Sequence, residues 1–170
     1  MAATNMQIFS TGRARIGDVG GLLTDDANGV GFIQDFSVNP SHEEKAAYEA
    51  AWINQFRSVV AFHNGDLKVK LTVLDIERNL FVRIAGGALV TADDVDTITI
   101  SKTSKPTFFR LEVDLEDTNG NAIMVVVPNA YAKDINLSTK IDDFGNLPLE
   151  ISGLPDADGN VCIITAVTGG

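Results

Sequence analysis

The chain has 170 residues, of which 45% are hydrophobic and 21% charged, the balance of a folded globular protein. Its formal net charge of −10 argues against a polyanionic partner, because nucleic-acid binders place clustered Lys and Arg against phosphates. The first residues lack a basic stretch followed by an apolar run, and no segment reaches about 18 consecutive apolar residues. We therefore expect neither a secretory signal nor a membrane-spanning helix.

The first 30 residues have weak hydropathy patterning, so we expect an arm, a first strand and a long loop there. Apolar and polar residues then alternate over 32–39, which predicts a half-buried strand. Residues 41–52 carry a capping-box pattern, with Ser41 three positions before Glu44, followed by good helix formers. Taken locally, this segment favours a helix.

The next elements are two further strands with a tight turn between them. A strand is predicted over 57–63, and Asn64 and Gly65 then predict a turn. Leu67, Val69, Leu71 and Val73 alternate with polar residues, which is typical of a strand with one wet face.

One segment, residues 75–85, has the period of a helix. Its apolar positions recur every fourth residue, Asp75 can act as the N-cap, and Gly86 and Gly87 end the pattern. The apolar stripe of this helix consists of Ile76, Leu80 and Ile84. After the helix, a further strand is predicted over 96–101.

The second half of the chain predicts two hairpins, because strand-like runs are joined by segments rich in Asp, Asn and Gly. The first hairpin has strands at 109–115 and 122–127 around a turn at 117–121. The second has strands at 147–154 and 161–167 around a turn at 155–160.

These elements predict a mainly β protein: a two-sheet antiparallel β-sandwich with one flanking α-helix and an extended N-terminal arm. At this length one core is the expectation, so residues 1–170 form a single domain. Within it we expect the arm and first strand with its loop over 1–30, the sandwich core over 31–167, and a loose C-terminus over 168–170.

The residues that could carry chemistry have simpler structural interpretations. His42 and His63 have no partner at a spacing typical of zinc sites, and no serine lies in a G-x-S-x-G setting. The glycines of 17–21 lack the Lys-Ser/Thr of a phosphate loop, which favours a bend. Cys162, within an apolar run, is expected to be a buried, inert thiol. We therefore predict no catalytic, cofactor-binding or metal-binding residues, and we expect that the protein is not an enzyme.

The acidic segments could be calcium sites or turns. Residues 156–160 begin like an oxygen-rich cation loop, yet the glycine falls at the fourth place and no glutamate follows at the twelfth, which favours a hairpin turn. The same holds for 142–146. The pairs at 43–44 and 93–94 are interpreted as solvated surface. Trp52, with Tyr48 and Phe56 four residues away on each side, could form a ligand platform but fits a core or subunit contact better.

The order of these elements resembles that in the tail tube (major tail) proteins of phages with long, non-contractile tails. Three pieces of sequence carry the resemblance: a long strand and its polar continuation, a strand leading directly into the helix, and the closing hairpin. They lie at residues 31–45, 68–87 and 147–161.

The resemblance implies a structural virion protein that assembles in the host bacterial cytoplasm. Six copies would form a ring, and the rings would stack into a tube through which DNA and a tape-measure protein pass, with tail terminator and tip proteins as further partners. An acidic conduit suits such passage, because a basic wall would hold the duplex. In members of this family the segment that corresponds to 41–52 continues as strand and loop toward a neighbouring subunit. The local pattern predicts a helix and the resemblance implies extended structure, so both alternatives remain for 41–52.

Two alternatives remain at this point. Another ring-forming subunit, such as a type VI secretion tube or a tail terminator, would share the architecture. A small β-sandwich binding module, for carbohydrate or calcium, would instead use Trp52 or the Asp-rich turns.

Overall fold

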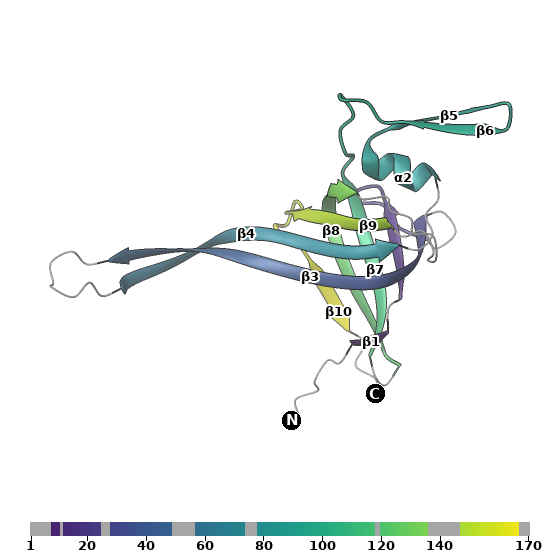
Figure 1. Cartoon of the computed structure of the whole chain (residues 1–170). Coiled ribbons are helices and arrows are strands. Elements are labelled where there is room, and N and C mark those ends of the chain that lie inside the picture. Colours follow the sequence, from purple (N-terminus) through teal and green to yellow (C-terminus); the bar gives the residue numbers. More distant parts are fainter. Residues whose placement is uncertain are drawn as a thin grey trace, which may run out of the picture.

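The computed structural model describes residues 8–10, 12–24, 28–48, 57–73, 78–117, 120–135 and 147–166. Within these ranges the chain is mainly antiparallel β-structure with one short helix, which confirms the predicted fold class (Figure 1). Most of the predicted N-terminal arm, residues 1–7, and the predicted loose end at 168–170 lie outside the described residues.

Six strands of the large sheet form a closed ring, in which each strand pairs with the next and the last pairs with the first. The sides of this ring enclose one hydrophobic core, as the two layers of the predicted sandwich would. In ring order the strands are β2 (Arg13–Gly17), β3 (Gly29–Tyr48), β4 (Arg57–Val73), β9 (Leu147–Leu154), β8 (Ala122–Ile135) and β7 (Phe109–Asp117).

Alternate residues of the strands build the core, because successive side chains of a strand point to opposite faces of the sheet. In β4 every second residue from Leu67 to Val73 is buried, as the alternation predicts. Val69 pairs with the buried Ile151 of β9, so apolar side chains from the two strands lie side by side on the inner face. The largest fully buried side chains include Phe109, Ile16, Leu71, Ile84, Leu111, Ile123 and Ile151.

Asn64 and Gly65 lie within β4, so the predicted turn is wrong. Pairing steps from Pro40 opposite Leu67 to His42 opposite Asn64, and β4 therefore contributes one residue more than β3 across this step. Such an extra residue is a β-bulge, and glycine inside a strand is a usual marker of one. The continuous ladder with β3 overrides the local turn signal.

Residues 41–48 belong to β3, so the helix interpretation is wrong for this part of 41–52 and the extended alternative is right. Residues 49–52 lie outside the described ranges. The reason is tertiary: 42–48 pair along their length with 57–64 of β4, and helix propensity is too weak to compete with such a ladder.

The hairpin of β7 and β8 is confirmed, but the predicted pairing of β9 with the last strand is wrong. Strand β9 has the predicted bounds, whereas β10 (Ile163–Ala166) pairs with β8, placing Ile163 opposite Val126. One edge of β8 thus serves two strands, with 129–135 pairing with β9 and 123–126 with β10. The turn at 155–160 carries the chain away from β9 instead of folding it back.

Helix α2 (Arg78–Ala85) buries Leu80 and Ile84, as the apolar stripe predicts. The proposed N-cap Asp75 and the first stripe residue Ile76 lie outside the described residues. The helix sits beyond one end of the ring, where it packs near the end of β8 (Figure 1).

Gly86 ends the helix, as predicted, and only glycine suits its position. Its φ of 69° lies in the left-handed region, and the Gly87 N–H donates to the carbonyl of Val82 at 3.1 Å. A Cβ at Gly86 would also lie 1.8 Å from the carbonyl oxygen of Lys105. The chain after the helix is therefore held closely against the segment around Lys105.

Two short elements complete the description. Strands β5 (Ala88–Ala92) and β6 (Val95–Thr99) form a separate hairpin, of which the sequence predicted only the second strand, at 96–101. Asp93 and Asp94 form its turn, both with positive φ. At the N-terminal end, β1 (Ile8–Ser10) pairs with the end of β7.

Candidate assembly surfaces

The most distinctive surface is the far half of the β3–β4 hairpin, which we name the ribbon and define as residues 41–48 and 57–66. Its two strands stay paired with each other as far as Tyr48, which lies opposite Arg57. Figure 1 shows the ribbon extending well away from the closed ring. Eight residues of β-strand span about 25 Å, so the ribbon reaches far beyond the body.

The ribbon has two free edges among the described strands. Strand β2 pairs with β3 only near its start, with Arg13 opposite Phe32 and Arg15 opposite Gly29. Strand β9 pairs with β4 only from Leu67 onward. Over 42–48 and 57–64, no described strand pairs with the outer backbone edge of either ribbon strand, and a sheet edge without a neighbouring strand is a template for strand addition.

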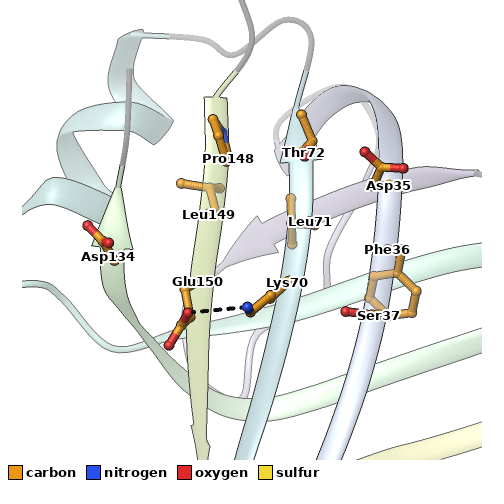
Figure 2. Close-up of a pocket in the computed structure, with 10 residues that line it drawn as sticks. All are labelled: Asp35, Phe36, Ser37, Lys70, Leu71, Thr72, Asp134, Pro148, Leu149 and Glu150. Carbon is orange, nitrogen blue, oxygen red and sulfur yellow. Dashed lines mark ion pairs between the residues drawn. The ribbon is translucent and has the colours of Figure 1, made fainter. Parts of the chain in front are cut away.

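A polar face covers the outside of β3, β4 and β9 where they belong to the ring. Lys70 pairs in register with Glu150, and its Nζ lies 3.8 Å from Glu150 Oε2. Lys133 Nζ lies at the same distance from Glu150 Oε1. Figure 2 shows Lys70 and Glu150 reaching toward each other, with Asp35 and Asp134 to either side. Positive and negative groups are therefore interspersed on this polar face.

The polar face is hollowed rather than flat, with a cavity of about 580 Å³ bordered by Asp35, Lys70, Asp134 and Glu150 (Figure 2). Exposed large apolar side chains gather elsewhere in the described part of the chain. Where the side chains of β3, β4 and β9 are described, at 33–41, 67–73 and 147–154, none of these exposed apolar residues occurs. They are Val19, Leu22, Val90, Val95, Ile100, Phe108, Met124, Ile163 and Ile164.

The outside of β2 and β7 carries a tighter ionic cluster. Arg15 Nη2 lies 2.8 Å from Asp114 Oδ2, and Arg15 Nε lies 3.3 Å from Glu112 Oε2. Arg110 Nη2 approaches the other Glu112 oxygen at 2.7 Å. Glu112 is only 7% exposed, so two guanidinium groups enclose this carboxylate. The cluster links β2 to β7 by ion pairs, and we interpret its role as structural.

Beyond the ring, β7 and β8 continue into a small open sheet with β1 and β10 on its two edges. All four residues of β10 are exposed, including the large apolar Ile163 and Ile164. Met124, next to this edge on β8, is exposed as well. This apolar edge is a second surface suited to contact with another chain.

The β5–β6 hairpin is anchored to α2 by polar contacts. Arg78 forms an ion pair with Asp96, and the Thr91 hydroxyl donates to Asp96 Oδ1 at 2.5 Å. The Thr91 hydrogen bond, followed by the Arg78 guanidinium, lowers the pKa of the Asp96 carboxyl below its usual range. The opposite face of the hairpin exposes Val90 and Val95.

The acidic residues singled out from the sequence have structural roles where they are described. Asp156 Oδ1 accepts the backbone N–H groups of Asp158 and Asn160, at 2.9 and 2.8 Å. These donors, the Asn160 N–H first, lower the pKa of the Asp156 carboxyl. Gly159 takes a φ of 84°, so residues 156–160 form a turn, although the strands on either side of it do not pair as the predicted hairpin. Residues 142–146 lie outside the described ranges.

The remaining candidate residues are not brought together into a site. His42 lies opposite Asn64, and His63 lies opposite Glu43. Cys162 packs against the core but is only half-buried, not fully buried as predicted, and its partial burial raises the pKa of the thiol. Trp52 lies outside the described residues. Among the residues that are described, no group of three or more His, Cys, Asp and Glu side chains could hold a metal ion.

The sequence patterns missed the ribbon edges, which no described strand covers, because an edge is defined by the absence of a neighbouring strand. They also missed Leu22, which is 97% exposed in the loop after β2. Its only sequence signal is a pair of leucines directly after two glycines.

No protein-family model matches the chain, and no curated protein sequence matches it. Within the described residues, no helix is both long and apolar enough to cross a membrane.

Proposed function

We propose that the chain is a structural subunit of a phage tail, in which hexameric rings stack into the tail tube of a long-tailed phage. The observation that carries this proposal is the ribbon, a long two-stranded extension whose outer edges are covered by no strand of the described part of the chain. The order of elements along the chain, which resembles that of tail tube proteins, gives the proposal its specific form.

The ribbon is difficult to explain in an isolated chain. A two-stranded hairpin without a third strand or a packing partner is marginally stable in water. Evolution usually shortens or blocks exposed edges, since they invite pairing with other chains. A neighbouring copy that covers the ribbon would stabilise it and satisfy its backbone groups. A contact between different patches on equivalent copies closes into a ring when the rotation permits.

The distribution of side chains suits a tube wall. The polar face has interspersed lysines and carboxylates, and its described side chains include no exposed large apolar residue, as a surface facing water in a channel requires. The exposed apolar residues lie on β5, β6, β8, β10 and the loops, where they are available for contacts between copies. A chain of net charge −10 would let a duplex pass without gripping its phosphates.

In this proposal the chain performs no catalysis. DNA and a tape-measure protein occupy the channel, and terminator and tip proteins bind the two ends of the tube. The protein acts in the virion as a passive conduit for DNA delivery to the host.

The proposal is tested by removing the ribbon and keeping the ring of strands. Pro40 and Leu67 pair directly, so replacing residues 41–66 by Asn-Gly joins them through a two-residue hairpin turn. We expect this variant to keep its β-type circular dichroism and its cooperative melting, and to sediment as a monomer at concentrations where the full chain forms large assemblies. A variant that assembles as well as the full chain would contradict the role of the ribbon.

A further inference from the structure

Strand β10 is an open edge of the small sheet that it forms with β8, β7 and β1. One side of its backbone pairs with β8, from Ile163 opposite Val126 to Ala166 opposite Ile123. No described strand pairs with its other side. The stretch that contains β10, residues 161–167, has no Asp, Glu, Lys, Arg or Pro, which are the residues that usually block an edge. This edge is therefore open to strand addition by another chain.

The two isoleucines of β10 place apolar side chains on both faces of the sheet. Ile163 is 41% exposed and Ile164 is 51% exposed, and successive residues of a strand point to opposite faces. A strand with one face in water usually alternates apolar and polar residues, whereas a continuous apolar run is typical of a strand that is covered on both faces. We therefore interpret β10 as a strand that another chain covers in the assembly.

The ribbon has one edge of the same kind. Its β3 strand carries three consecutive charged residues, Glu43, Glu44 and Lys45, and charges on an edge discourage strand addition. In its β4 strand, by contrast, residues 58–64 include no Asp, Glu, Lys, Arg or Pro. This stretch is as long as 161–167. The β4 edge of the ribbon is therefore the edge suited to pairing with β10 of another copy.

The other described edges are poorer partners for the ribbon. Strand β1 has only three residues, and its pairing with β7 is irregular between Ile8 and Ser10, as in edges that resist strand addition. Strand β5 is uncharged, but it belongs to a separate two-stranded hairpin. A strand added to β10 instead extends a sheet that is packed on the core, because Ile123 and Val125 of β8 are buried there. Packing of this kind is what makes an added strand stable.

We propose that residues 58–64 in the ribbon of one copy add as an antiparallel strand to the open edge of β10 in a neighbouring copy. This contact rests on the proposed self-association into rings and identifies what covers the ribbon. Every described strand pairing within the chain is antiparallel as well. Because the ribbon and β10 are different patches, the contact is head-to-tail, and each copy both gives a ribbon and receives one.

Two variants that each keep one half of the contact test it. The acceptor lacks the ribbon, through replacement of 41–66 by Asn-Gly, and keeps β10. The donor keeps the ribbon and carries Ile163→Lys and Ile164→Lys, which place a charge on each face of β10. Both isoleucines are exposed, so we expect the donor to keep the wild-type melting temperature. Each variant alone is expected to sediment as a monomer, and an equimolar mixture as a one-to-one dimer.

Two further acceptors locate the contact on the ring. An acceptor that also carries Ile163→Lys and Ile164→Lys is expected to bind the donor at least about tenfold more weakly, because the added strand would bury unpaired charges. The matched control acceptor carries Val90→Lys and Val95→Lys on the β5–β6 hairpin, at positions 59% and 61% exposed. This control is expected to bind the donor as tightly as the unmodified acceptor. Weakening by the hairpin lysines alone would show that the ribbon binds the hairpin instead.

Hydrogen exchange on the wild-type chain tests the contact without substitutions. The backbone amides of 58–64 and of 163–166 are expected to gain protection together when the chain assembles. Protection of the ribbon without protection of 163–166 would overturn the β10 contact and leave the proposed tube intact, and so would an acceptor that dimerises by itself. A wild-type chain that stays monomeric at every concentration would overturn both.

Discussion

Tyr48, the last residue of β3, pairs with Arg57, the first residue of β4, and no other described strand pairs with either of them. A ladder that continues so far from the core contributes little stability to an isolated chain. Its length is explained if another copy covers it. The proposed tube therefore makes predictions both for the separate subunit and for the assembly.

Trypsin should distinguish the ribbon of a free subunit from the ribbon of an assembled subunit. Lys45 and Arg57 are cleavage sites on its two strands. Since a two-stranded ladder outside the closed ring opens easily, we expect rapid cleavage at both sites in dilute monomer and strong protection after assembly. The measurement is a digestion time course analysed by mass spectrometry. Equal cleavage rates in monomer and assembly would show that no neighbour covers the ribbon.

Leu80 should be a major contributor to the stability of the subunit, because it is only 5% exposed on the core face of α2. We expect Leu80→Ala to lower the free energy of unfolding by about 2–5 kcal/mol, as for other large-to-small core substitutions. Val90→Ala, at a position 59% exposed, should change it by no more than about 0.5 kcal/mol. Chemical denaturation of both variants measures the difference, and equal values would mean that the helix does not pack on the core.

The two ionic clusters should differ in importance. Glu112→Ala leaves Arg15 and Arg110 without their shared buried carboxylate, and we expect a loss of about 3–5 kcal/mol. Glu150→Ala removes a carboxylate whose lysine partners are at 3.8 Å and more than half exposed, and we expect a loss below about 1 kcal/mol. Denaturant unfolding of the two variants provides the comparison. A larger loss for Glu150→Ala would contradict the assignment of the buried cluster as the structural one.

Duplex DNA should bind neither the subunit nor the assembly with appreciable affinity. Proteins built for non-specific binding neutralise phosphates and reach dissociation constants of about 10⁻⁴–10⁻⁶ M at physiological salt. With a net charge of −10, and with lysines on the polar face next to carboxylates, this chain should bind more weakly. A titration across a salt series tests this expectation. Micromolar binding that weakens steeply with salt would contradict a passive conduit.

Local patterns predicted the elements whose cause is local. The alternation from Leu67 to Val73, the bounds of β9 and the glycine that ends α2 all follow from hydropathy period or from backbone conformation. Turn composition was a weaker guide. Asn64 and Gly65 have the sequence of a hairpin turn, but the ladder between β3 and β4 runs through them as a bulge.

Strand partners could not be predicted, since pairing depends on contacts between distant parts of the chain. β9 and β10 are neighbours in sequence and yet both pair with β8, and β2 closes the ring by pairing with β7. The candidate surfaces depend on the same information. No described strand covers the ribbon edges, because the pairing of β2 with β3 and of β9 with β4 ends before the ribbon begins.

The central claim is that copies of this chain build a hollow tube. Negative-stain electron microscopy of the purified full-length chain, at increasing protein concentration, tests it most directly. We predict rings with sixfold symmetry at low concentration and hollow filaments of stacked rings at high concentration. A uniform field of particles of single-chain size at every concentration would contradict the claim.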